Sequence, residues 1–225
     1  MLRYIFFSMA LFCSGMTYGQ AKEEFRKATE NLPKAPQGIT LGVNLAGPFN
    51  SLMDGDRSGF SFVSRFNLAE DYFFMGEAGF EQISFEKEAY DYESNGTFLK
   101  AGIEKDILNN KRSVVDNLLM GLQYGFALQS QSASRFLVNN GYWDDYEGSI
   151  GSETLTSHWF ELSAGPRAEL FKNFYIGWKI HLRVSLVNTG QDVMKPYIIP
   201  GFGNGDNSVN AAFSYTLEYM IPWKK

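Results

Sequence analysis

Cysteine and histidine are scarce in this chain of 225 residues, which contains one Cys and two His. The single cysteine, Cys13, lies in an apolar N-terminal segment. The rest of the chain can therefore form no disulfide, and it offers neither a thiol nucleophile nor a cysteine metal site. The two histidines, His158 and His181, leave few options for acid–base catalysis or for a histidine metal site.

The sequence also lacks an excess of positive charge and the long apolar runs of helical membrane proteins. Its 20 Lys and Arg against 25 Asp and Glu give a net charge of −5, which disfavours nucleic-acid binding. A mean hydropathy of −0.22 is too polar for a bundle of membrane helices. Large apolar residues are nevertheless abundant, with 20 Phe and 12 Tyr, so the chain is not disordered. An aromatic-rich soluble β protein and a membrane β-barrel remain.

The N-terminus has the pattern of a targeting segment. Arg3 precedes an apolar run over residues 4–12, and small and polar residues follow over 13–19. Phe12 stands where a lipoprotein signal needs a small residue, so lipidation of Cys13 is not expected. We predict a cleaved signal peptide at residues 1–19. Residues 20–37 are rich in helix formers and end in prolines, which predicts a short periplasmic leader, either solvated or able to dock on a partner.

From residue 38 onward, apolar and polar residues alternate with the period of β-strands. The pattern predicts eight strands, several of them long enough to cross a bilayer when tilted. The apolar face is bulky throughout, whereas the other face mixes charged residues with Gly, Ala and Ser, as suits a narrow polar lumen. The candidate strands cover residues 39–46, 60–68, 74–81, 99–104, 118–129, 160–170, 174–186 and 209–223.

The connections between these strands alternate in length, which favours a barrel in the outer membrane. Long loops are expected at residues 47–58, 87–95, 130–155 and 188–207, and short turns at 69–71, 106–115 and 171–173. The fold class is therefore all-β: an eight-stranded antiparallel transmembrane β-barrel over residues 38–225. Pro166 fits poorly, because a closed barrel has no free edge for a residue without an N–H, and it implies a bulge or a shorter sixth strand.

The polar face predicts a network of charges inside the barrel. Eight strands leave an interior just wide enough for side chains, and charges buried there must pair. The short turn at Lys172 places Glu161 opposite Arg183, and the turn at Glu70 places Arg65 diagonal to Glu77. The expected network comprises Arg65, Glu77, Glu81, Lys100, Glu104, Glu161, Arg167, Glu169, Lys179, His181, Arg183 and Glu218. An interfacial aromatic girdle is expected at Tyr72, Phe174, Tyr219 and Trp223.

The C-terminal region carries a resemblance to a known family. The stretch Pro196-Tyr197-Ile198-Ile199-Pro200-Gly201-Phe202-Gly203 and the ending Ile221-Pro222-Trp223-Lys224-Lys225 resemble a family of small outer-membrane β-barrel proteins from Bacteroidetes-type bacteria. The resemblance implies a barrel in the outer membrane of a Gram-negative cell envelope and no assigned activity. The ending departs from the usual barrel-assembly signal, because two lysines follow the last aromatic residue.

These features predict a non-enzymatic outer-membrane barrel with a side-chain-filled lumen, serving as a structural or interaction subunit in envelope assembly. We expect no cofactor, no catalytic or metal site and no nucleic-acid partner. The expected partners are outer-membrane lipid and an envelope protein, either a lipoprotein or an assembly complex. Two alternatives stay open: an outer-membrane lipid hydrolase using Ser157 and His158, and a soluble periplasmic lipocalin-like binding barrel.

Overall fold

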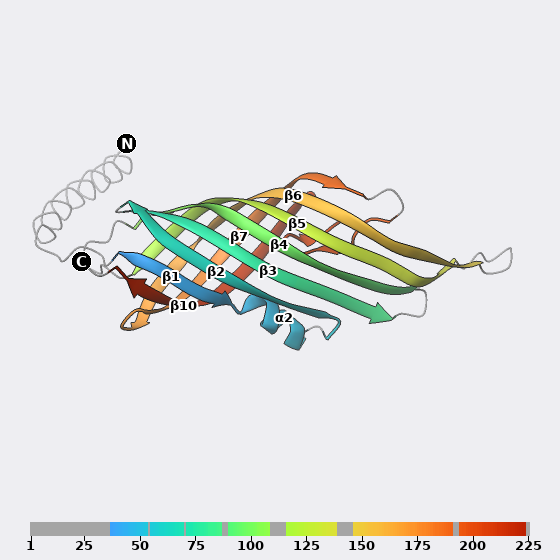
Figure 1. Cartoon of the computed structure of the whole chain (residues 1–225), viewed down its shortest axis with the longest axis horizontal. Helices are drawn as coiled ribbons and strands as arrows, with labels where there is room; N and C mark the ends of the chain where they lie inside the picture. The colour runs from blue at the N-terminus through green and yellow to red at the C-terminus, as the bar shows by residue number, and fades with distance from the viewer. Residues whose placement is uncertain are drawn as a thin grey trace, which may run out of the picture. The chain divides into compact units, whose positions relative to one another are not determined.

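The computed structural model describes residues 37–53, 55–69, 71–86, 90–108, 116–138, 146–190 and 194–223. Within them, eight antiparallel strands form a closed barrel in the order β1-β10-β7-β6-β5-β4-β3-β2 (Figure 1). The predicted all-β fold class is confirmed. The predicted signal peptide and nearly all of the predicted leader lie outside the described residues. No helix in the described part of the chain is long and apolar enough to cross a membrane.

The strands alternate in direction, and neighbours in the chain are neighbours in the sheet except where β1 closes the ring against β10. Near this closure the Trp223 amide donates to the Gln37 carbonyl at 2.8 Å, so the two ends of the described chain meet. We call this the turn end of the barrel and the opposite one the loop end. The barrel strands are β1 (Gly38–Asn44), β2 (Arg57–Ala69), β3 (Tyr72–Glu86), β4 (Tyr90–Asp106), β5 (Asn117–Val138), β6 (Tyr146–Phe171), β7 (Phe174–Thr189) and β10 (Val209–Pro222).

The strands differ widely in length, and this corrects the predicted loops. β1 has 7 residues, whereas β5 has 22 and β6 has 26. Much of the loop predicted at 130–155 is therefore a hairpin, because a polar strand that leaves the barrel shows no alternation. Strands β3 to β6 continue past the loop end as a four-stranded sheet, which we call the sheet extension (Figure 1).

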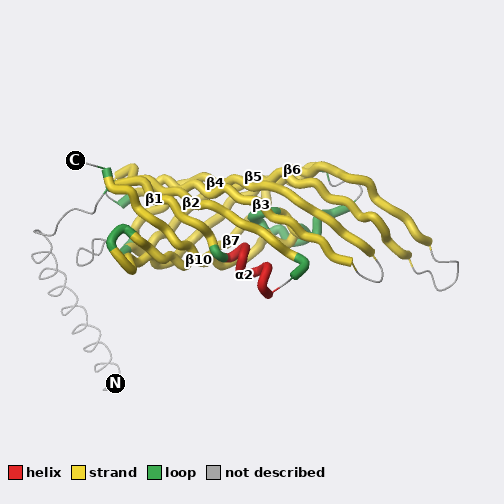
Figure 2. Tube along the Cα trace, turned by 60° about the horizontal axis from the view of Figure 1, so that its bottom comes forward, coloured by secondary structure: helices red, strands yellow, loops and turns green. Residues whose placement is uncertain are grey.

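Two other predicted loops also contain ordered structure. Helix α2 (Ala46–Met53) begins one residue after the short β1, at the last residue of the predicted first strand, and continues into the loop predicted at 47–58 (Figure 2). Residues 188–207 include a two-stranded hairpin of β8 (Ile198–Ile199) and β9 (Gly203–Asn204), and Ile199 and Phe202 are buried. This loop is therefore folded against the barrel rather than solvated.

The outward face of the barrel is apolar all round. Large side chains from every barrel strand are a third to two thirds exposed, and they alternate with buried polar residues. This arrangement is the reverse of a soluble barrel, whose apolar residues would fill the interior. The exposed set includes Leu41, Phe62, Phe66, Phe80, Leu99, Ile103, Met120, Leu122, Leu128, Phe160, Leu162, Trp178, Ile180, Leu182, Val184, Phe213, Tyr215 and Tyr219.

Pro166 causes neither the predicted bulge nor a shortened strand. It pairs with Leu118 of β5, and β6 continues to Phe171. On the β7 side, the ladder stops at Ala164↔Ile180 and resumes at Arg167↔Gly177 with the same register. At Gly165 a Cβ atom would lie 1.9 Å from the Trp178 carbonyl oxygen, so the backbones approach closely where glycine precedes the proline. The strand therefore accommodates the missing donor by a local gap in the ladder.

Candidate functional site

The charged residues of the lumen form two groups of ion pairs. In the first group, Arg65 lies between two carboxylates, with its Nε 2.6 Å from Glu104 and its Nη1 against Glu218. Glu104 also accepts from Lys179, and Glu218 accepts from Arg167 at 2.9 Å. The Arg167 guanidinium lies over the Tyr175 ring, 3.7 Å from its centroid. All five charged side chains are nearly inaccessible to solvent.

The second group is centred on Glu161 and lies further towards the loop end. Arg183 is directly opposite Glu161 in the β6–β7 register, and its Nε lies 2.7 Å from the carboxylate. Lys100 bridges Glu161 at 3.2 Å and Glu77 at 3.0 Å. His181 connects Glu161 at 2.6 Å to the Ser214 hydroxyl at 2.7 Å. Because each carboxylate faces at least one cation, the group can remain ionised in a buried place.

Some partners differ from those that the turn positions suggested. Arg65 is diagonal to Glu77 in the register, yet it pairs with Glu104 of β4 and Glu218 of β10, each of which is two strands away. Side chains of strands that are not neighbours meet here because the interior of an eight-stranded barrel is only about as wide as its side chains. Alternation along single strands gives no information about contacts across the lumen.

Two members of the predicted network lie outside these groups. Glu169 accepts a hydrogen bond from the Asn173 amide, and so it caps the β6–β7 turn. Glu81 pairs with Arg57, whose Nε lies 2.7 Å away, and it also accepts from the Gly201 amide at 3.2 Å. Arg57 was missed because it falls in a segment predicted as a loop. Its alternation with Gly59 and Ser61 was the available signal.

The segment of residues 194–205, which we call the plug, closes the lumen on the loop-end side of the charges. Four lumen side chains hold its backbone: Gln131 and Gln129 donate to the Met194 and Ile198 carbonyls, Arg183 donates to Phe202, and Glu81 accepts from Gly201. The plug coincides with the C-terminal motif on which the family resemblance rested. Its conformation is thus tied to the charge network through Arg183 and Glu81.

An apolar cluster anchors the plug inside the barrel. Phe202 and Ile199 pack with Ala127 and Trp159, and the Trp159 and Phe202 rings are 5.7 Å apart. Trp159 is completely buried in the lumen, where the alternation predicted polar or small residues. Gly125 makes room for its ring, since a Cβ atom there would lie 2.1 Å from the indole. The lumen is therefore not filled by charges alone.

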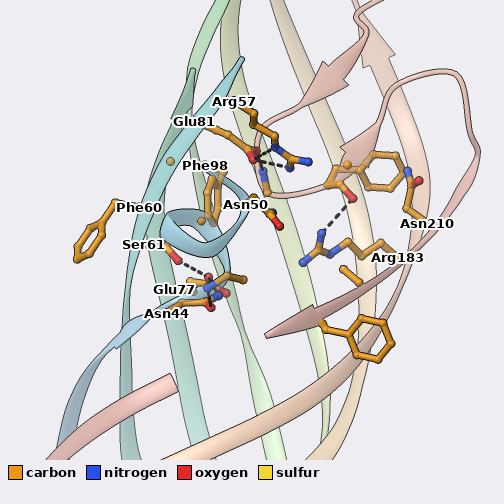
Figure 3. A pocket seen from close by; sticks show the side chains of 18 of the residues that line it. Asn44, Asn50, Arg57, Phe60, Ser61, Glu77, Glu81, Phe98, Arg183 and Asn210 are labelled. Carbon is orange, nitrogen blue, oxygen red and sulfur yellow. Dashed lines mark hydrogen bonds and ion pairs between the residues drawn. The ribbon is translucent and has the colours of Figure 1, made fainter. Parts of the chain in front are cut away.

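A cavity of about 460 Å³ lies between the plug, the second group of charges and helix α2. Figure 3 shows Asn50 of α2, the Arg57–Glu81 pair, Arg183 and Asn210 around it. The prediction of a lumen filled by side chains is therefore wrong for this part of the barrel. The large side chains there pack against the plug or form ion pairs, and they leave the space beside α2 open.

The residues of the alternative hydrolase site point in opposite directions. The Ser157 side chain is buried on the lumen face, whereas His158 lies on the outward face, where its Nδ1 is 2.6 Å from the Tyr124 hydroxyl. Consecutive residues of a strand face opposite sides of the sheet, so this histidine cannot take a proton from the serine. Among the described residues, no group of three or more His, Cys, Asp and Glu could hold a metal ion.

The predicted girdle residues all lie at the turn end. Tyr72 begins β3 and is 42% exposed, Tyr219 pairs with Phe174 at the start of β7, and Trp223 follows β10. Lys105 lies 5.2 Å from the centroid of the Tyr72 ring. Aromatic rings beside a cationic side chain are the composition expected at a lipid–water boundary.

Comparison with known families and proteins gives a match over the whole chain. A family model described as "Domain of unknown function (DUF6048)" matches residues 1–225. No match was found among curated proteins. The family description assigns no activity, in keeping with the predicted resemblance, whereas the Bacteroidetes origin and the C-terminal motif remain predictions.

Outer-membrane proteins are among the solved structures to which the chain is similar. Ail, the attachment invasion locus protein of Yersinia pestis, is 13% identical with a TM-score of 0.41, and the match covers 84% of this chain and 99% of Ail. A second Ail structure contains the heparin analogue sucrose octasulfate. A major outer membrane protein of Thermus thermophilus is 10% identical with a TM-score of 0.45, covering 83% of this chain and 98% of that one.

Proposed function

The chain belongs to the DUF6048 family, and from the geometry of its barrel we propose that it is a non-enzymatic outer-membrane protein with a closed lumen. In this role it serves as a structural or interaction subunit of the cell envelope. The observation that carries the proposal is the combination of an apolar outer wall with a lumen blocked by paired charges and by the plug.

The outer wall supports insertion into a membrane. Exposed large apolar side chains encircle the barrel, and water would contact all of them if the protein were soluble. A closed sheet satisfies its backbone groups without water, which is the requirement for spanning a bilayer with strands. These features favour the membrane barrel over the lipocalin-like alternative, whose apolar residues would lie inside.

The lumen supports a role other than transport. Lys179 of β7 pairs with Glu104 of β4, three strands away around the ring, so the first group of ion pairs extends from wall to wall. The plug then covers the second group from the loop end. An ion moving along the axis would have to displace both obstacles.

Recordings in planar bilayers test the closed lumen. We expect the purified protein to insert without sustained conductance, and a Phe202→Ala/Arg183→Met variant, which removes two anchors of the plug, to show more frequent openings. The control is Leu182→Ala, which lies on the outward face of β7 beside Arg183 and should show no sustained conductance. Steady ohmic conductance of the unmodified protein would contradict the proposal and indicate a channel.

The sheet extension is the surface that we propose for a protein partner. Over residues 146–155, β6 pairs with β5, and no strand of the described chain pairs with its other edge. An unpaired edge is a template for strand addition. Ser149 and Gly151 are exposed on it. The leader at residues 20–37 and the signal peptide at residues 1–19 stay part of this proposal as predictions from the sequence.

Purification in mild detergent tests the partner. Ser149→Lys/Gly151→Lys should blunt the edge by charge and release an envelope protein that co-purifies with the unmodified barrel. The control is Glu93→Lys on β4. This strand pairs with β3 on one side and with β5 on the other, so the substitution leaves the free edge of β6 unchanged. Equal recovery of the partner with both variants would show that the edge is not its binding surface.

A further inference from the structure

The barrel wall is incomplete beside helix α2. Strand β1 ends at Asn44, which pairs with Thr216 of β10 on one side and with Ser61 of β2 on the other. Beyond this level, residues 209–214 of β10 pair only with β7, and residues 57–60 of β2 pair only with β3, within the described chain. Helix α2 stands in the gap between them (Figure 2).

The helix covers the two sides of this gap unequally. Against β2 the fit is tight, since a Cβ atom on Gly47 would lie 2.5 Å from the Gly59 carbonyl oxygen. Against β10, the backbone hydrogen bonds of the wall end with the Leu45 amide on the Tyr215 carbonyl, 2.7 Å away. The β10 edge beyond Tyr215 is therefore the open side. We call it the side opening.

The cavity of about 460 Å³ passes through this side opening. Its lining includes lumen side chains such as Arg183 and Asn210 together with outward-facing aromatic residues, namely Phe213 and Tyr215. Phe213 and Tyr215 are 57% and 46% exposed and belong to the apolar outer face. One cavity can touch both faces of a strand only where the wall has an opening.

The polar part of the cavity favours an uncharged ligand. Arg57 is paired with Glu81, Arg183 with Glu161, and Lys100 with Glu77 and Glu161. A charged group would disturb this balance in a poorly solvated place. Apart from Ser61, whose hydroxyl donates to Glu77, the remaining polar lining consists of amide side chains, which donate and accept hydrogen bonds as hydroxyl groups require. They are Asn44, Asn50, Asn204 and Asn210.

The apolar part of the cavity favours a hydrocarbon chain. Phe60, Phe80 and Phe213 line its outer part, together with Phe49 of α2, which is also exposed. An aliphatic chain lying across these rings would remain in the bilayer while its polar head occupied the lumen. The volume is within the usual range for small-molecule sites.

We propose that this cavity binds an amphipathic lipid with an uncharged, hydroxyl-rich head, which enters sideways from the membrane between β10 and α2. The head occupies the space among Asn50, Asn210 and Arg183 (Figure 3). The chain leaves through the side opening over Phe213. This inference rests on the proposed insertion into a membrane. Its test therefore includes a separate signal for insertion.

Methyl NMR of the whole protein in phosphatidylcholine nanodiscs tests the site, with alanine methyl groups as reporters and dodecyl maltoside below its micelle concentration as the probe. Ala46, Ala211 and Ala212 line the cavity, whereas Ala101 lies on the outward face of β4. We expect saturable shifts for the three cavity methyl groups and none that saturates for Ala101. Ala212→Phe should weaken the binding about tenfold or more, read from Ala46 and Ala211, and Ala101→Phe is the matched control.

Three further probes decide which part of the ligand is recognised. Maltose alone, dodecane alone and dodecylphosphocholine should each bind at least about tenfold more weakly than dodecyl maltoside. If any of these three probes bound as tightly as dodecyl maltoside, the proposal would be overturned. Equal binding of maltose would indicate a site for soluble sugars, equal binding of dodecane a purely apolar site, and equal binding of dodecylphosphocholine a site that does not distinguish between head groups. Absence of saturable shifts with dodecyl maltoside would also overturn it.

A spin-labelled lipid separates this result from the proposed function. If the lipid broadens the Ala101 signal, the barrel is inserted, and missing cavity shifts then refute the lipid site alone. If Ala101 is not broadened, the proposed insertion itself fails and the lateral entry of a lipid fails with it.

Discussion

Glu104 shows how individual residues allow charges to remain inside this barrel. Its side chain is fully buried, and it accepts from both Arg65 and Lys179. Arg65 also pairs with a second carboxylate, that of Glu218. Within the described chain, Lys179 forms its ion pair with Glu104. The two cations therefore depend on Glu104 to different degrees.

Glu104→Gln should destabilise the barrel by about 3–5 kcal/mol, because it leaves the Lys179 ammonium buried without a carboxylate. Adding Lys179→Met removes that charge and should recover most of the loss. The midpoint of urea unfolding in micelles measures both effects. Glu93→Gln on the exposed side of β4 is the control, with a change below about 0.5 kcal/mol. If the double variant is no more stable than Glu104→Gln, this account of the ion pair is wrong.

The plug is the element whose structure depends most on its surroundings. Its hairpin has two pairs of residues, too few to be stable in isolation. Hydrogen bonds from the wall and the Trp159–Phe202 contact hold it in place. At its tip, Gly201 has a φ of +71°, and a Cβ atom there would lie 2.5 Å from the Phe98 ring. Only glycine satisfies both conditions without strain.

Gly201→Val should therefore dislodge the plug without unfolding the barrel. A β-branched residue in the left-handed region costs on the order of 1–2 kcal/mol, and the clash with Phe98 adds to it. We expect faster proteolysis within residues 194–205 and unchanged mobility of the folded barrel on unheated gels. Gly151→Val is the matched control, since a Cβ atom there meets nothing within 4 Å. Equal proteolysis of both variants would show that the tip does not hold the plug.

At the scale of the whole molecule, the barrel combines two different halves. The turn end is closed and crossed by ion pairs, whereas the loop end carries the plug and the cavity. The sheet extension also continues from the loop end (Figure 1). Closure removes strand edges from the first half. The short β1 and the long β6 leave edges in the second half, and both proposed binding surfaces lie there.

The closed half predicts resistance to detergent. Every strand there has two neighbours, so SDS finds no edge at which unfolding can begin, and unheated protein should migrate differently from boiled protein. The protein should also stay with outer membranes after a carbonate wash. Identical migration before and after boiling, together with release by carbonate, would refute the membrane barrel.

The alternation of residue types alone was enough to predict the class, the strand number and the two faces of the barrel. Side chains of a strand alternate with period two, and a barrel in lipid reverses the usual distribution of polar and apolar residues. Short turns also determined register locally, as between Glu161 and Arg183. These are properties of neighbouring residues, and a sequence records them directly.

Only the tertiary structure decided what meets inside the barrel. The pairing of Arg65 with Glu218, the burial of Trp159 and the docking of Phe202 join strands and loops distant in the chain. The side opening likewise depends on where β1 stops relative to β2 and β10. Closure of the ring creates these contacts, and alternation along one strand carries no information about the opposite wall.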